Sequence, residues 1–446
     1  MLNKKLYIGI LFFLTGCGAD YNSTSEALLS ETPAGNVCTA PNCTDTVVPP
    51  PVTDTLPSTA ILVASASELT TALQNAVAGD TIALASGSYG LLVVNNRNFS
   101  QNVTIRPQIN AVPVFKSLRV QSSSRLVFSG LTFSPRLASG DSMGDAVLLN
   151  GQDIIFEKSL ITFADDTTSW SAARWVNETG NGISAGGTRI TIRDNVLRNL
   201  GFGISVSATN SLVARNKVKD FRGDALRGLG DNTTFEYNDV RNCYQVDSNH
   251  MDGFQSWSLG SGGTVGTGVV TGITLRGNYF TDHENQSHPL KCNLQAIGLF
   301  DGMFKDWVVE NNVIVTNHYH AISFYGAINV KIVNNTVIDP NLTDTIRPWI
   351  MITNHKNGTV SSGSVIRNNI SPSVNAGTET AASNNLISNS GNLAQIFENP
   401  AQLDYRLKMG GLAIDTGTSL NAPALDFMGL SRLVGGGVDI GAYEYR

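Results

Sequence analysis

Five of the six histidines in this chain of 446 residues fall within a short stretch: His250, His283, His288, His318 and His320. An imidazole takes up and releases protons near neutral pH, so it is suited to general acid–base chemistry. The same stretch and its flank supply carboxylates at Asp224 and Asp252 and cations at Arg227 and Lys291. These residue types could remove a proton from a substrate, neutralise a substrate carboxylate, or bind a cation.

A short phrase recurs through this part of the chain. It is an alternating apolar run, an Asn, and a second alternating run, as in TRITIRDNVLRNL from Thr188. The Asn falls at positions 195, 216, 238, 278, 312, 335 and 369. Each copy predicts two short strands joined at a bend. A strand-only repeat of about 22 residues predicts an all-β solenoid, a right-handed parallel β-helix. We expect each Asn to take the left-handed bend and to bond to the Asn one coil away. The Leu spacing of a leucine-rich horseshoe is absent.

The strands that follow each turn align as a ladder. They read FGIS from Phe202, DALR from Asp224, DGFQ from Asp252, QAIG from Gln295 and HAIS from His320. The apolar third position should face the core, and the polar first and fourth positions should project outward. Since neighbouring coils stack about 4.8 Å apart, Asp224, Asp252, Gln295 and His320 should form one line. Arg227 and Gln255 should form a second line beside it.

Three intervals in the repeat are longer than one coil, and the extra residues of the first two include NHMDGFQSWS from Asn249 and HENQSHPLK from His283. Insertions on consecutive coils build walls along one face, which predicts a binding groove for a linear polymer.

β-Elimination from a polymer of uronic acids would use these residue types. It needs a base for the C5 proton, a group that neutralises the adjacent carboxylate, and an acid for the leaving oxygen. His250 and His320 are the candidate bases, with Lys291 as another if burial lowers its pKa. Arg227, Gln255 and Gln295 could neutralise the carboxylate, as could Ca²⁺ held by Asp224 and Asp252.

Further candidates complete this predicted site. Asp252 is also a candidate catalytic carboxylate, and Tyr319 or Tyr325 could donate the proton. His318, Trp257 and Tyr325 are candidate substrate-binding residues. Each has a structural alternative: the aspartates could cap turns, and Arg227 could form an ion pair with Asp224.

The N-terminus combines Lys4 and Lys5, an apolar run from Leu6 to Leu14, and Leu-Thr-Gly-Cys ending at Cys17. The run is too short for a stable membrane span. It resembles a bacterial lipoprotein signal peptide, which implies cleavage before Cys17 and lipidation of its thiol. By the same resemblance, Gly18 favours the outer membrane of the cell envelope.

We expect a signal peptide over 1–16, a Ser/Thr/Pro-rich tether over 17–58, a β-helix over 59–403 and a C-terminal cap over 404–446. Cys38 and Cys43 could close a loop in the tether. Cys243 and Cys292 could be buried thiols or a disulfide. Only 15% of residues are charged and the net charge is −6, so nucleic acid is excluded as a partner, and a monomer is expected.

The segment from Ala66 to Gly90 predicts an amphipathic helix that covers the first coil. Leu69, Leu73 and Val77 would share a face, and Ser67 would be the N-cap. Together with its GDTI phrase, this segment resembles the opening of polysaccharide lyases of the chondroitinase B and alginate lyase type. The phrases DYRL, AIDTG and VDIGAYEY resemble the terminal cap of secreted bacterial β-helix proteins.

The resemblance does not extend to catalytic residues, because the Lys/Arg phrase of the chondroitinase B type is absent. NHMDGFQ and HAIS faintly resemble two phrases of polygalacturonases, but Gln295 stands where those enzymes have paired aspartates. The sequence therefore predicts an exported, lipid-anchored lyase that acts on an acidic polysaccharide. A glycoside hydrolase, a uronate C5-epimerase and a non-catalytic carbohydrate-binding protein remain the alternatives.

Overall fold

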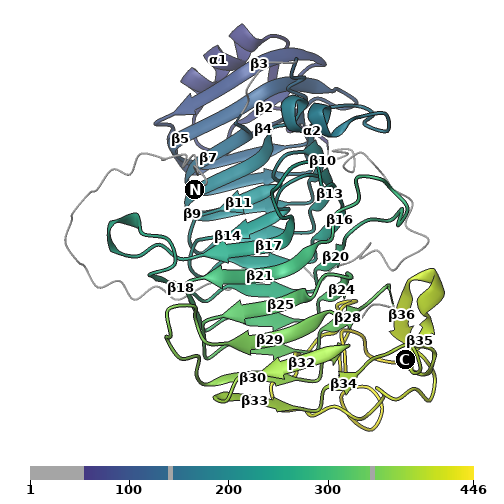
Figure 1. Ribbon diagram of the computed structural model, residues 1–446. Coiled ribbons are helices and arrows are strands. Elements are labelled where there is room, and N and C mark those ends of the chain that lie inside the picture. Colours follow the sequence, from purple (N-terminus) through teal and green to yellow (C-terminus); the bar gives the residue numbers. More distant parts are fainter. Residues whose placement is uncertain (1–54, 139–143, 342–346) are drawn as a thin grey trace. The chain divides into compact units, whose positions relative to one another are not determined.

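The computed structural model describes residues 55–138, 144–341 and 347–446, which belong to one compact unit. In these residues, 31 strands join into one hydrogen-bonded network. Its strands pair in parallel with the strand one coil away: β11 (Ile204–Val206) pairs with β14 (Leu226–Gly228), and β14 pairs with β17 (Asp252–Trp257). The network is a parallel β-helix, as predicted (Figure 1). Cys17, Cys38 and Cys43 lie outside the described residues.

Each regular coil contributes a strand to each of three faces. The site sheet contains β11, β14, β17, β21 (Gln295–Asp301), β25 (His320–Tyr325), β29 (Trp349–Thr353) and β32 (Ser373–Ala376). The second sheet contains β12 (Leu212–Ala214), β15 (Thr234–Glu236), β19 (Thr274–Arg276), β23 (Val308–Glu310), β27 (Lys331–Val333), β30 (Ser364–Arg367) and β33 (Thr380–Ser383). The third contains β8 (Leu160–Thr162), β10 (Val196–Leu200), β13 (Lys217–Phe221), β16 (Asp239–Cys243), β20 (Tyr279–Thr281), β24 (Val313–Val315), β28 (Thr336–Ile338), β31 (Ile370–Ser371) and β34 (Leu386–Ile387).

The strands of the first coils are β1 (Ile61–Val63), β2 (Thr81–Leu84), β3 (Gly87–Asn95), β4 (Asn98–Pro107), β5 (Pro113–Ser129), β6 (Thr132–Phe133), β7 (Asp145–Glu157) and β9 (Asn181–Arg193). Some of them are long enough to run through more than one face, since β5 pairs with both β3 and β4, and β9 pairs with both β11 and β12. β9 continues the stack toward the site sheet through its pairing with β11.

The repeated Asn forms a continuous ladder at the corner between the second and third sheets. The amide of Asn278 donates to Oδ1 of Asn312 over 2.9 Å, and Asn238 donates to Oδ1 of Asn278 over 3.0 Å. The same link joins the other members: Asn195, Asn216, Asn335, Asn369 and Asn385. The predicted coil-to-coil bonding is confirmed.

The bend itself is one residue earlier than predicted. The residue before each ladder Asn has the left-handed backbone, as in Arg215, with a φ of 54°, and Asn334, also with a φ of 54°. The ladder Asn is therefore free to turn its amide inward, where it is buried. The side-chain amides of Asn334 and of the other asparagines at the bend bond to the C-terminal segment instead.

Helix α1 (Ala66–Asn75) packs on β1, β2 and β3 and covers the first coil (Figure 1). Leu69 and Leu73 are buried, as predicted. The N-cap is Ser65, whose hydroxyl accepts the N–H of Glu68, so the prediction of Ser67 was wrong. Val77 lies beyond the helix and is exposed, because the chain leaves the helix at Ala76.

Two insertions on the third-sheet side are tied together. Cys243, at the end of β16, forms a disulfide with Cys292. Tyr244 pairs with Lys291 in an antiparallel bridge, and the Tyr244 ring stacks at 4.4 Å on Trp175 of helix α2 (Ala172–Glu178). On the other side, β18 (Val269–Thr271), β22 (Met303–Lys305) and β26 (Ala327–Ile328) form a small parallel sheet.

The C-terminal segment starts with α3 (Leu393–Ile396) and the antiparallel pair β35 (Phe397–Asn399) and β36 (Asp404–Leu407). It then bonds to four asparagines at the bends, defined here as the corner asparagines. The contacts are Asn311 to Leu425, Asn334 to Asp439, Asn368 to Thr418 and Asn384 to Thr416, each from the side-chain amide to a backbone oxygen. The segment thus lies along the corner of the last coils. No helix among the described residues is long and apolar enough to cross a membrane.

Candidate functional site

The predicted ladder is present on the site sheet. Asp252 pairs with Gln295, and Arg227 pairs with Gln255. Gly298 pairs with Ser323, which places Gln295 one coil before His320. The third positions, Ile204, Leu226, Phe254, Ile297 and Ile322, are buried in the core. The register was therefore predicted correctly.

The first positions are less exposed than predicted. Asp224, Asp252 and His320 are all buried, and Gln295 is half-buried. Buried carboxylates need partners, and the site is organised around how each of them is satisfied.

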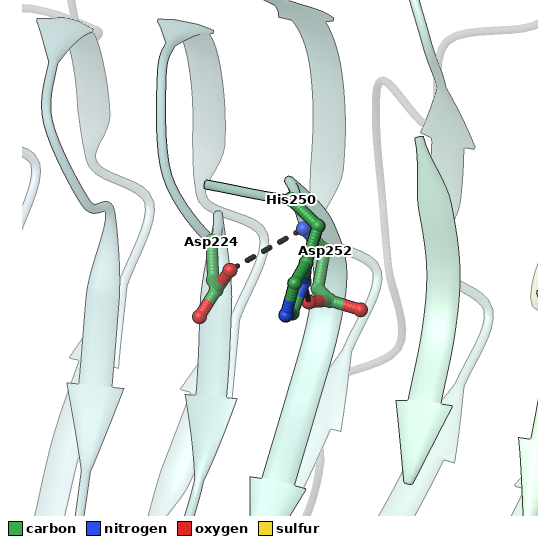
Figure 2. A group of neighbouring side chains, drawn as sticks. All are labelled: Asp224, His250 and Asp252. Carbon is green, nitrogen blue, oxygen red and sulfur yellow. Dashed lines mark hydrogen bonds and ion pairs between the residues drawn. The ribbon is translucent and has the colours of Figure 1, made fainter. Parts of the chain in front are cut away.

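Asp252 and His250 form a hydrogen-bonded pair at the start of β17 (Figure 2). Nδ1 of His250 lies 2.7 Å from Oδ2 of Asp252, and the amide of Gln255 donates to the same oxygen over 3.0 Å. The Asp252 side chain is fully buried, whereas 56% of the His250 side chain is exposed. The hydrogen bond to Asp252 raises the pKa of His250, and burial raises the pKa of Asp252. The pair titrates as a unit.

The other oxygen of Asp252 has a special environment. Oδ1 is buried and has no hydrogen-bond partner among the described residues. A Cβ atom at Gly298 would lie 2.5 Å from it. Glycine at this position on β21 is therefore what leaves room for the carboxylate.

Asp224 and Arg227 form a second pair one coil earlier. Nε of Arg227 donates to Oδ2 of Asp224 over 2.6 Å, and Oδ1 of Asp224 accepts the backbone N–H of Asp252 over 3.3 Å. The guanidinium lies 4.1 Å from the ring centre of Phe202 and 5.4 Å from that of Trp257. The ion pair that the sequence left as an alternative is present, and Arg227 remains half-buried beside the His250–Asp252 pair.

Asp224, His250 and Asp252 could together hold a metal ion, since one ligand atom from each lies within 4.8 Å of the others. Ca²⁺ prefers about 6–8 oxygen ligands, whereas this set offers two carboxylates and an imidazole. Arg227 already occupies Oδ2 of Asp224, and His250 occupies Oδ2 of Asp252. The residues present fit a calcium ion poorly.

His320 lies at the centre of an aromatic cluster on β21, β25, β29 and the turn before β25. The cluster, so named below, consists of Phe300, His318, Tyr319, His320, Tyr325 and Trp349. Nδ1 of His320 lies 2.8 Å from Oγ of Ser323, which also accepts the indole N–H of Trp349 over 3.0 Å. These bonds fix the imidazole ring and leave Nε2 for a ligand.

Both histidines of the aromatic cluster are neutral at neutral pH. Burial, together with the charge of His318, lowers the pKa of His320 to about 4. Burial, together with the charge of His250, lowers the pKa of His318 to about 4. The aromatic cluster begins one strand from the His250–Asp252 pair, because β17 pairs with β21, which carries Phe300, and β21 pairs with β25, which carries His320.

Lys291 is placed away from this site. Its Nζ donates to Oε1 of Gln286 over 2.9 Å and lies 4.0 Å from Asp282. His283 and His288 belong to the same insertion, stack on each other at 4.9 Å and contact Tyr244 edge-on. Three of the clustered histidines, His250, His318 and His320, are thus brought together, and these two are not.

The remaining candidates lie on the outer face of the site sheet. Trp257 contacts Arg227, and Tyr325 contacts Phe300. Burial raises the pKa of Tyr325, so its hydroxyl stays protonated. Phe300, Ser323 and Gly298 were missed as site residues. The sequence could have indicated Ser323, since it holds the fourth position of the ladder. It gives no indication of the register shift in the pairing of β17 with β21 that exposes Phe300.

Comparison with known proteins gives a likeness at the level of fold. No protein-family model and no curated protein matches the chain. The PL6 family alginate lyase AlyGC is 15% identical, with a TM-score of 0.45 over 73% of this chain and 51% of that one. This chain therefore spans about half the length of that structure.

Other solved structures match over more of their own length. Pectate lyase Pel9A is 14% identical, with a TM-score of 0.40 over 84% of this chain and 90% of that one. The A-module of the Azotobacter vinelandii mannuronan C-5 epimerase AlgE6 is 15% identical, with a TM-score of 0.43 over 72% of this chain and 93% of that one. At such identities the likeness concerns the fold alone.

Proposed function

We propose that the outer face of the site sheet binds an acidic polysaccharide and cleaves it by β-elimination. The observation that carries this proposal is the 2.7 Å hydrogen bond between the exposed imidazole of His250 and the buried carboxyl group of Asp252. An exposed imidazole that a buried carboxylate orients is an arrangement suited to proton transfer.

His250 is the base in this mechanism. When Asp252 accepts the Nδ1 proton, the Nε2 lone pair of His250 faces outward and can remove the proton on C5 of a uronate. The carboxylate of Asp252 then stabilises the imidazolium that forms. His320 is less suited to this step, because its low pKa of about 4 makes it a weak base.

Arg227 and Gln255 neutralise the uronate carboxylate. They are paired on neighbouring strands, beside the His250–Asp252 pair. Neutralisation matters because removal of the C5 proton places extra negative charge on that carboxylate in the transition state. Nε and Nη2 of Arg227 bond to the carboxylate of Asp224, and Nη1 is the group that we assign to the substrate carboxylate.

Tyr319 is the acid that we assign to the leaving oxygen. Its ring stacks at 4.3 Å on His318, and 37% of the residue is exposed. The elimination then balances: the C5 proton moves to His250, the C4–O bond breaks, a C4–C5 double bond forms, and the oxygen takes the Tyr319 proton.

A C5-epimerase would use the same proton removal and is the second candidate. An inverting hydrolase is less favoured. Inverting glycosidases hold two carboxyl groups about 6.5–9.5 Å apart, but ligand atoms of Asp224 and Asp252 lie within 4.8 Å. In addition, both carboxylates are bonded to a basic side chain.

The test is to assay the chain on acidic polysaccharides for the ultraviolet absorbance of an unsaturated uronate. We expect the wild type to produce it on one polymer, His250→Gln to lose nearly all of it, and His288→Gln, outside the site, to retain it. New reducing ends without this absorbance would indicate a hydrolase. Exchange of the C5 proton without cleavage would indicate an epimerase.

Export and lipid attachment at Cys17 are also proposed. The support is the signal-like N-terminus and the Cys243–Cys292 disulfide, since such bonds persist mainly in oxidising compartments. Cys17→Ser should shift the chain from the membrane fraction to the soluble fraction. Retention of this variant in membranes would contradict the anchor.

A further inference from the structure

The aromatic cluster adjoins the proposed catalytic pair but has a different chemical character. Its rings pack against one another at centroid distances from 4.3 to 6.0 Å around His320. Phe300, Tyr325 and Trp349 are half-buried and Tyr319 is exposed. The cluster therefore presents apolar ring surface together with hydroxyl, indole and imidazole groups.

The two cations nearest to this cluster and the catalytic pair, Lys356 and Arg227, are bonded to carboxylates. Nζ of Lys356 lies 5.9 Å from the ring centre of Phe300 but bonds to Asp301 over 2.9 Å. Arg227 is bonded to Asp224. Arg347, just before Trp349, lines a small cavity with Asp339 and Leu393. His318 and His320 are neutral at neutral pH, because burial lowers both of their pKa values.

This arrangement suits an uncharged sugar and not a uronate. A carboxylate that moved from water onto neutral rings would lose hydration without gaining a cation. A neutral pyranose has an apolar face of C–H groups that can pack on aromatic rings, and its hydroxyls can bond to polar groups at the edge. Nε2 of His320 is such a group, since Nδ1 is committed to Ser323.

We infer that the aromatic cluster is a subsite for an uncharged hexose or N-acetylhexosamine next to the uronate at Arg227 and Gln255. This inference rests on the proposed function and narrows its substrate class. The polymer is a heteropolysaccharide in which uronates adjoin neutral sugars, and not a polymer of uronates alone.

Binding by calorimetry tests the inference on the full chain carrying His250→Gln, so that ligand is not consumed. The probes are hexasaccharides of equal length. Those of hyaluronan and unsulfated chondroitin alternate glucuronate with N-acetylhexosamine, those of alginate and polygalacturonate contain only uronates, and cellohexaose is uncharged. We expect an alternating hexasaccharide to bind at least about tenfold more tightly than either uronate hexamer, the equivalent of about 1.4 kcal/mol.

Substitutions in the cluster locate the preference. Tyr319→Ala and Trp349→Ala should reduce binding of the alternating ligand about tenfold while changing binding of the uronate hexamers less than about twofold. Tyr319→Phe keeps the ring and should retain the preference. The inference would be overturned if the uronate hexamers bound as tightly as the alternating ligands or more tightly. It would also be overturned if the preference for an alternating ligand survived in both alanine variants.

The two proposals fail separately. If alginate or polygalacturonate gave unsaturated product at the same rate as an alternating polymer, the subsite proposal would be contradicted and the lyase proposal would stand. If an alternating ligand bound preferentially but no unsaturated product formed, the lyase proposal would be contradicted and the subsite proposal would stand. Tyr319→Phe sharpens the distinction, because it should retain binding and lose turnover.

Discussion

The imidazole of His250 is bonded to a carboxyl group that solvent does not reach. Its Nδ1 atom lies 2.7 Å from Oδ2 of Asp252, whose side chain is fully buried. The bond fixes the plane of an otherwise exposed ring and determines which nitrogen faces the outer surface of the site sheet. It is also the contact on which the proposed chemistry depends most.

Asp252→Asn should lower the rate constant of the chemical step about 10²- to 10⁴-fold, the scale of a well-placed acid–base group. The amide can no longer stabilise an imidazolium, although it fills the same space. KM should change little, because Asp252 does not touch the substrate. Asp153→Asn removes an ion pair with Arg189 in the first coils and serves as the control. Equal rates for wild type and Asp252→Asn would remove Asp252 from the mechanism.

The dependence of kcat/KM on pH should have an acid limb that His250 sets. The base must be neutral, so activity rises as pH passes through its pKa. The bond to Asp252 raises that pKa, which places the limb above the ordinary value of about 6.5. In Asp252→Asn the residual activity should have its acid limb at lower pH. A limb that stays in place in this variant would point to another titrating group.

His283 and His320 should each make a contribution to stability that is lost as the pH is lowered from about 6.5 to about 4. Burial lowers the pKa of His283 and of His320 to about 4, so the unfolded chain binds more protons than the folded chain in this window, and the free energy of unfolding increases with pH there. Urea unfolding at several pH values measures it. A variant with both His283→Gln and His320→Gln should show a weaker dependence.

His250→Gln is the control of opposite sign for this measurement. Its pKa is raised, so its contribution to stability is present at pH values below its unfolded pKa and is lost as pH rises through the folded pKa. Its removal should lower the free energy of unfolding by a constant amount below about pH 6.5 and should leave the slope between about pH 6.5 and 4 unchanged. A destabilisation that grows as the pH rises above about 6.5 would contradict the assigned direction.

Asn278→Ala should lower the free energy of unfolding by about 2–5 kcal/mol, because it leaves buried hydrogen-bonding groups without partners. Oδ1 of Asn278 accepts both the backbone and side-chain N–H groups of Asn238. Denaturant unfolding monitored by circular dichroism gives the value. Asn385→Ala at the half-buried end of the ladder is the matched control, and water should limit its cost to about 1 kcal/mol. Equal losses at the two sites would contradict this account of the ladder.

Treatment with EDTA should leave turnover unchanged. Arg227 and His250 already occupy the carboxylates that a calcium ion would need. The measurement compares rates after chelation with and without added Ca²⁺. If activity disappears and Ca²⁺ restores it, Asp224 must release Arg227 to bind the ion, and the unpartnered Oδ1 of Asp252 becomes its second ligand.

Most of the fold could be predicted because its signal is local and repeated. One Asn in each coil and β-branched runs of similar length determine both the strand pairing and the alignment of the site sheet. The same uniformity explains why Asp252, Gln295 and Arg227 were placed correctly in the ladder. The left-handed backbone was predicted at the ladder Asn, because Asn often adopts it, but it occurs at the residue before. The ladder Asn instead turns its side-chain amide inward to bond to the next coil.

The environment of the site residues could not be read in the same way. Whether Asp252 is buried depends on how the turn around His250 folds and on the missing side chain at Gly298. The position of Lys291 depends on its pairing with Tyr244 and on the disulfide next to both. These contacts join residues far apart in the chain, and no repeat specifies them.

The corner asparagines give the solenoid a fixed length at one end. The C-terminal segment bonds to Asn311, Asn334, Asn368 and Asn384 together. A coil duplicated among these positions would therefore move the asparagines away from the backbone oxygens of the segment that they bond to. The same positions in earlier coils carry Asp194, Arg215, Tyr237 and Gly277 in place of asparagine. Gene duplication could therefore add coils ahead of Asn311, near the catalytic strands of the site sheet. The number of coils that bond to the C-terminal segment would stay the same.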